Sequence, residues 1–185
     1  MSRWISLLLI LCLAVPALPV CAESTRKIVT EFDDFILRTD WAMQLRNKKA
    51  DNQPLFLFYP FVTGNVAMTA INATWSRDGQ FITPEEFSLM HRDAEALIRA
   101  QYEASGRVLE SYETKDAVEK EFWGRKSLVC DAVLTVKTND TAILLNQRAI
   151  RVTGDFGAYT FSIAAWSPEL LDEATDYLLV ALEWK

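Results

Sequence analysis

The chain has few of the residues on which catalytic and metal sites depend. It carries three cysteines and one histidine among 185 residues. Cys12 and Cys21 lie in an N-terminal leader, so Cys130 alone remains and no intramolecular disulfide is expected. A single histidine excludes a zinc site built from several imidazoles, and no Gly-x-Ser-x-Gly sequence supplies a hydrolase nucleophile. We therefore predict no catalytic residue, no cofactor and no metal site.

Positive charge is also scarce. The 19 Lys and Arg residues are outnumbered by 25 Asp and Glu, which gives a formal net charge of -6. Nucleic acids and anionic lipid surfaces attract proteins through basic side chains. We therefore expect no nucleic-acid partner, whereas an acidic surface suits a basic protein partner or a cation.

The apolar run at the N-terminus is too short for a stable membrane span. It extends from Trp4 to Val15 and is followed by Pro16 and Pro19, before the roughly 20 residues that a spanning helix needs. Arg3 in front of the run and the small residues near Ala22 complete the pattern of a secretory signal peptide. The pattern predicts an exported protein.

The domain boundaries follow from that leader. Residues 1–22 are predicted to be a signal peptide, and residues 23–185 a single globular domain that begins at Glu23. Export without disulfides favours a periplasmic location. Lipidation of Cys21 is the alternative, although Val20 is bulkier than the residue that usually precedes a lipidated cysteine.

Two segments have the pattern of amphipathic helices. The first is predicted from Thr83, as the cap of a capping box with Glu86, to about Ser105, with Gly106 ending it. The second begins with Ser167-Pro168-Glu169. Apolar residues at helical spacing place one face of each helix on a core.

The remaining segments have the period of two that is typical of strands. Short turns between them, such as Gly154–Gly157, favour antiparallel pairing, because parallel strands need long crossovers. The predicted fold class is α+β, an antiparallel sheet with two packed helices. The predicted strands are residues 54–61, 66–75, 107–112, 127–136, 142–152 and 158–166.

The reactive residues have structural interpretations. His91 lies at the margin of the first helix's apolar stripe, and Cys130 shares a strand face with apolar residues, so both are expected to pack rather than react. Adjacent carboxylates such as Asp33 and Asp34 leave a calcium site open as an alternative, but no Asp-x-Asp-x-Asp-Gly loop is present.

Phe122 and Trp123 are the candidate partner-binding residues. They follow the charged run from Lys115 to Glu121 and precede Gly124, a context that suits a loop tip. Exposed aromatic residues surrounded by charge are common anchors of protein interfaces. Packing of both rings in the core is the equal alternative.

Much of the chain resembles the PsbP-like family, which includes periplasmic DcrB-like proteins and secretion chaperones. The similar features are the Thr83-Pro84-Glu85-Glu86-Phe87 helix start, the strand Tyr159–Ile163 and the second Pro-Glu helix start at Pro168. Leu182–Lys185 departs from the family's usual ending. The resemblance implies a PsbP-like fold and, by analogy alone, a role in binding proteins.

These observations favour a non-catalytic exported envelope protein that binds a protein partner, such as an immunity protein that neutralises a secreted toxin. The alternative is a periplasmic protein that binds a small ligand or a lipid. A deep apolar pocket would favour the alternative, whereas a protruding or concave surface with aromatic and charged residues would favour a protein partner.

Overall fold

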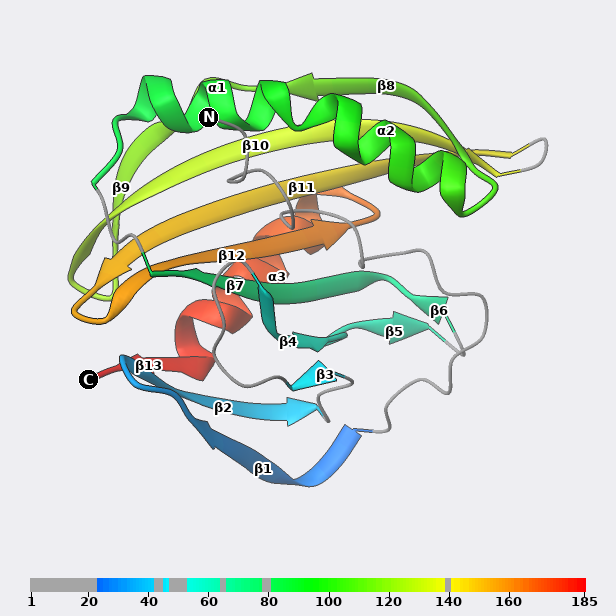
Figure 1. Ribbon diagram of the computed structural model, residues 1–185. Coiled ribbons are helices and arrows are strands. Elements are labelled where there is room, and N and C mark those ends of the chain that lie inside the picture. Colours follow the sequence, from blue (N-terminus) through cyan, green and yellow to red (C-terminus); the bar gives the residue numbers. More distant parts are fainter. Residues whose placement is uncertain (1–22, 42–44, 47–52, 64–65, 78–80, 139–140) are drawn as a thin grey trace.

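The computed structural model describes residues 23–185, with the exception of 42–44, 47–52, 64–65, 78–80 and 139–140 (Figure 1). Its largest element is an antiparallel main sheet in the order β3-β4-β7-β12-β11-β10-β8, with β9 paired to the same side of β10 as β8. The strands of the main sheet are β3 (Leu45–Arg46), β4 (Gln53–Phe58), β7 (Thr69–Ser76), β8 (Val108–Thr114), β9 (Val118–Phe122), β10 (Arg125–Thr138), β11 (Thr141–Gly154) and β12 (Gly157–Ala165).

A smaller sheet and three helices complete the described fold. The small sheet contains β1 (Glu23–Glu31), β2 (Phe35–Trp41) and β13 (Leu182–Trp184), and a separate pair is formed by β5 (Val62–Thr63) and β6 (Val66–Ala67). The helices are α1 (Pro84–Asp93), α2 (Glu95–Ala104) and α3 (Pro168–Ala181). The α+β class predicted from the sequence is confirmed, with antiparallel pairing throughout the main sheet.

The elements form layers on both faces of the main sheet. Helices α1 and α2 pack on β8 and β10, whereas α3 packs on β7, β11 and β12 on the opposite face together with β2 of the small sheet (Figure 1). Within the described residues, no helix is long and apolar enough to cross a membrane. Both faces of the main sheet therefore carry core residues.

The start of α1 agrees with its sequence pattern. The Thr83 hydroxyl accepts a hydrogen bond from the Glu86 N–H at 3.2 Å, and the Glu86 carboxylate accepts one from the Thr83 N–H at 2.8 Å. This reciprocal pairing satisfies two N–H groups that would otherwise lack partners at the first turn. Gly106 has φ of +75°, the left-handed conformation expected after a helix end.

The single helix predicted from Thr83 to Ser105 is instead two helices that meet at Ala94. Phe87 in α1 packs with Leu128 and Cys130, whereas Ile98 in α2 packs with Leu134 further along β10. Ala94 is buried and links the two halves. The break lets each half follow its own part of the twisted sheet, which helical periodicity alone does not reveal.

The region between α2 and α3 contains one strand more than its sequence pattern predicts. Four were predicted, and β9 is a fifth, formed by residues assigned to a charged run and a loop. Its Glu119, Lys120 and Glu121 are exposed, as charged residues on an edge strand often are. The C-terminal residues Leu182–Lys185, which differ from the usual ending of the PsbP-like family, include β13, a short strand that pairs with β2.

The largest cluster of buried apolar residues lies between the main sheet, α3 and the small sheet. Its aromatic residues come from β2, β4, β7 and β12, and they include Phe35, Phe56, Phe58, Trp75, Tyr159 and Phe161. Phe35 and Phe161 meet at a centroid distance of 5.8 Å. Close aromatic packing of this kind supplies much of the apolar burial that a domain without disulfides needs.

Candidate functional site

One face of the main sheet changes from apolar to polar beside α1. Side chains on alternate residues share a face, and strand register aligns them into rows. Leu128, Arg151, Thr160 and Thr74 are successive neighbours across β10, β11, β12 and β7. The next row holds Cys130, Ala149, Ser162 and Asn72. We call the polar part the polar sheet face, and define it as Asn72, Thr74, Ser76, Gln147, Arg151, Thr160 and Ser162.

A small pocket lies where this face meets α1. His91 of α1, Cys130 of β10, Gln147 of β11 and Ser162 of β12 are among the residues that line it. The enclosed space is about 10 Å³, which is room for roughly one water molecule. The pocket is thus too small for a lipid chain in this conformation.

Two buried polar atoms without partners belong to residues that line this pocket. Within the described part of the chain, the buried atoms His91 Nε2 and Gln147 Oε1 have no hydrogen-bond partner. An unpaired buried polar atom costs about 1–3 kcal/mol, so native proteins rarely keep several together without a use for them. The region is suited to binding a small polar group.

His91 is more buried than the sequence pattern predicted, with 4% of its surface exposed. Its ring contacts Phe87 edge-on at a centroid distance of 4.7 Å. Burial lowers the pKa of His91 to about 4, because the apolar surroundings disfavour the charged imidazolium. The imidazole is therefore neutral at physiological pH.

Cys130 lies on the apolar part of the same face, as predicted. The residue is 2% exposed, and its thiol donates a hydrogen bond to the Lys115 carbonyl oxygen at 3.4 Å. Burial is the main cause that raises the pKa of the thiol to about 11, and Asp131 adds to the shift. The thiolate, which is the reactive form, is scarce at neutral pH.

We expect Cys130 to resist labelling in the folded protein. With a thiol reagent at pH 8, the native protein should react at least about 100-fold more slowly than the protein unfolded in denaturant, since the thiol is both buried and protonated. The time course of reagent absorbance measures the two rates. Equal rates would contradict the predicted packing role.

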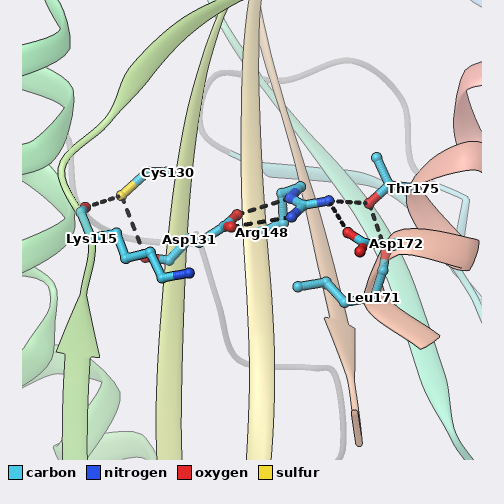
Figure 2. A network of polar contacts seen from close by, with 7 residues as sticks. All are labelled: Lys115, Cys130, Asp131, Arg148, Leu171, Asp172 and Thr175. Carbon is cyan, nitrogen blue, oxygen red and sulfur yellow. Dashed lines mark hydrogen bonds and ion pairs between the residues drawn. The ribbon is translucent and has the colours of Figure 1, made fainter. Parts of the chain in front are cut away.

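An ion-pair network holds α3 to the opposite face of the sheet (Figure 2). The Arg148 guanidinium donates to both carboxylate oxygens of Asp131, at 2.8 and 3.1 Å, and to Asp172 of α3 at 2.8 Å. It also donates to the Thr175 hydroxyl at 3.2 Å. This bidentate arrangement fixes the orientation of α3 against β10 and β11.

The carboxylates considered for calcium have other partners. The buried Asp34 carboxylate accepts hydrogen bonds from the Asp155 N–H at 2.9 Å, the Phe156 N–H at 3.3 Å and the Tyr159 hydroxyl at 2.5 Å. Among the described residues, no group of three or more His, Cys, Asp or Glu side chains could hold a metal ion. Asp34 joins the β1–β2 turn to the β11–β12 hairpin instead.

Phe122 and Trp123 are at a turn, as predicted, but Trp123 is directed inward. Phe122 pairs with Arg125, so Trp123 and Gly124 form a two-residue hairpin turn, with φ of 55° and 68°. The indole N–H donates to the Leu179 carbonyl at 3.1 Å, and its rings lie 5.4 Å from Phe161. Both side chains are partly buried against the main core. Binding of a partner by these two residues stays a prediction.

A second surface lies at the far end of the β10–β11 hairpin, on the side of α3. Strand register places Leu144 opposite Thr135, and Val108 opposite Lys137. Val108 and Leu144 are 53% and 52% exposed. We call this surface the open sheet face, and define it as Val108, Ser111, Val133, Thr135 and Leu144. In Figure 1 the hairpin extends past the end of α2.

The sequence analysis missed both surfaces. The polar sheet face has a recognisable signal in Ala70-Ile71-Asn72-Ala73-Thr74-Trp75-Ser76, where small polar residues alternate with apolar ones. The same alternation occurs in β12, at Thr160 and Ser162. The pattern identifies a strand with one polar face, although only the sheet order shows that the two polar faces are adjacent.

No family model matches the chain, and no curated protein matches it. Two solved structures are similar in part. The first is PA94 of Pseudomonas aeruginosa, a protein of unknown function, with 8% identity, a TM-score of 0.43, and coverage of 82% of this chain and 91% of that chain. The second is LpqN of Mycobacterium tuberculosis, which is involved in cell envelope biogenesis, with 9% identity, a TM-score of 0.34, and coverage of 86% and 83%. Neither is a named PsbP-like or DcrB-like protein, so that resemblance stays a prediction.

Proposed function

We propose that this protein is a non-catalytic, periplasmic envelope protein that binds a protein partner through the open sheet face. The observation that carries the proposal is the exposure of Val108 and Leu144, each more than half exposed, on one side of β8, β10 and β11. Apolar side chains grouped on a sheet surface are a common centre for a protein interface.

The net charge of the chain favours a basic partner, whereas the open sheet face has one acidic neighbour, Glu113, and one basic neighbour, Lys137. Glu113 is exposed on β8 and lies opposite Val133, and the chain as a whole carries a net charge of -6. A partner with apolar residues surrounded by Lys and Arg would match both features. Like-charge repulsion disfavours a second copy of this acidic chain.

The alternative, a lipid-binding or small-ligand protein, receives no support from the pocket beside α1. The pocket beside α1 encloses about 10 Å³, far below the roughly 300–1,000 Å³ of usual ligand pockets. Its ionisable groups also favour a non-catalytic role, since the His91 pKa is lowered to about 4 and the Cys130 pKa is raised to about 11. Neither group is adjusted for proton transfer near pH 7.

Neutralisation of a secreted toxin is the specific role that we favour within this class. An immunity protein must bind tightly and needs no chemistry of its own, so an exported acidic domain with an apolar contact surface suits the task. The identity of the captured partner tests this role separately from binding itself.

Site-specific photo-crosslinking tests the binding surface. We expect a crosslinking amino acid at Leu144 or Val108 to join the protein to one discrete partner in cells, whereas the same group at Val180 should not. Val180 is the matched control because it is 85% exposed on α3, away from the open sheet face. Equal crosslinking at all three positions, or at none, would overturn the proposal. A partner that is not a toxin would overturn the immunity role alone.

A further inference from the structure

Arg151 occupies an unusual position for a charged residue. It lies on β11 between Leu128 of β10 and Thr160 of β12, on the polar sheet face. Its side chain is partly buried, and burial lowers the pKa of the guanidinium from its ordinary value. An arginine keeps its charge even so, because its unperturbed pKa exceeds about 12.

No counter-charge accompanies this guanidinium. Within the part of the chain that the structure describes, Arg151 has no ion pair and no side-chain hydrogen bond. Desolvating a charge without a partner costs several kcal/mol in a protein. The cost is notable in a chain with 25 acidic residues, and it indicates that the position has a use other than stability.

Arg148 is an arginine on the same strand that has acidic partners and a structural role. Three residues before Arg151 and on the opposite face, it pairs with Asp131 and Asp172 (Figure 2). Its partners lie on β10 and α3, and they accept hydrogen bonds from two sides of the guanidinium group. Arg151 has the same guanidinium group and lies on the same strand, but it has no such partners.

The neighbours of Arg151 are hydrogen-bonding groups of small size. Thr160 lies directly opposite on β12, and Thr74 is the next residue across the sheet on β7. Ser76 contributes a buried hydroxyl with no partner among the described residues, one row further along β7. Hydroxyls can donate to an anion while the guanidinium supplies the charge.

We propose that Arg151 binds a carboxylate group, with the Thr160 hydroxyl as a second donor. The planar guanidinium matches the two oxygens of a carboxylate, and one positive charge balances one negative charge. A phosphate group carries about 1.5 to 2 negative charges near pH 7, which a single arginine does not balance. The site is distinct from the open sheet face and holds whether or not that face binds a protein.

Acetate is the probe that tests the site. In the purified protein at constant ionic strength, replacing chloride with acetate should give a saturable shift of the backbone N–H resonance of Thr160, which lies opposite Arg151. Arg151→Gln should abolish the saturable acetate response, and Arg151→Lys should weaken affinity at least about 10-fold because the fork is lost. Arg38→Gln is the control, since Arg38 is exposed and pairs with Glu183, and it should leave acetate binding unchanged.

A stability measurement separates a binding residue from a structural one. Replacing Arg151 with Met removes an unpaired, partly buried charge, so the melting temperature should rise by about 2–4 °C. If Arg151 had a structural role, the same substitution would lower the melting temperature instead. A fall, or an acetate response that persists in Arg151→Gln, overturns the proposal.

Two further probes identify the source of the carboxylate. Inorganic phosphate should bind more weakly than acetate, and tighter phosphate binding would overturn the carboxylate assignment. N-acetyl-glutamate amide presents the same group as an acidic protein side chain. Tighter binding of this compound than of acetate supports a protein carboxylate, and tighter binding of acetate supports a free small acid. Either result supports the proposed site, and both can be obtained without the crosslinked partner.

Discussion

Trp123→Ala is expected to lower the free energy of unfolding by about 3 kcal/mol. The side chain fills space between Phe122, Phe161 and Trp184, with ring centroids 5.4–6.1 Å away. Its N–H also donates to the Leu179 carbonyl of α3. Removing a large aromatic side chain from such a place leaves a cavity, which costs about 3–5 kcal/mol when burial is complete and somewhat less here.

Denaturant unfolding of the variant and the parent measures this loss, and a thermal melt should show a fall of about 10 °C. Phe156→Ala is the matched control. Phe156 also occupies a two-residue hairpin turn, but its side chain is 60% exposed, so truncation should cost less than about 0.5 kcal/mol. Equal stability of Trp123→Ala and the parent would contradict the packing role and favour the sequence-based alternative, in which this residue binds a partner.

Local sequence patterns predicted the features that local interactions determine. The Thr83 capping box and the Ser167 cap depend on residues within one helical turn. The Gly154–Gly157 hairpin was predicted for the same reason, since its two glycines pair directly across the turn. Alternation also predicted that the side chain of Cys130 faces the core.

Features determined by distant contacts were not predictable from one sequence. Trp123 is followed by Gly124 in a turn, which is compatible with an exposed tip, and only the contact with Leu179, 56 residues away, directs the ring inward. Arg148 and Arg151 look alike in the sequence. The structure separates them because register gives one of them Asp131 as a neighbour and the other Leu128.

Loss of the Asp34 carboxylate should cost more than loss of the Trp123 ring. Asp34→Ala is expected to lower the free energy of unfolding by about 4 kcal/mol. The substitution removes the acceptor of three hydrogen bonds, which are donated by the N–H groups of Asp155 and Phe156 and by the hydroxyl of Tyr159. Tyr159 is fully buried. A buried donor without an acceptor costs about 1–3 kcal/mol.

The fold explains why the residue next to this carboxylate on the hairpin is a glycine. Asp34 lies in the β1–β2 turn, 121 residues before the hairpin that it binds, and a Cβ atom added at Gly154 would lie 2.8 Å from the carboxylate carbon. The backbone of that hairpin thus approaches the carboxylate closely. The contact joins the small sheet to the end of the main sheet.

A double-mutant cycle in denaturant separates this hydrogen bonding from general disruption. Tyr159→Phe alone should cost about 1–2 kcal/mol, because it leaves Asp34 with one donor fewer. In the Asp34→Ala background the same change should cost less, since the hydrogen bond from Tyr159 to Asp34 is already lost, so the two residues should be coupled by at least about 1 kcal/mol. Asp155→Ala is the control, because its carboxylate is 79% exposed and its N–H remains, and it should cost less than about 0.5 kcal/mol. Additive losses for Asp34 and Tyr159 would show that the carboxylate does not act through the tyrosine.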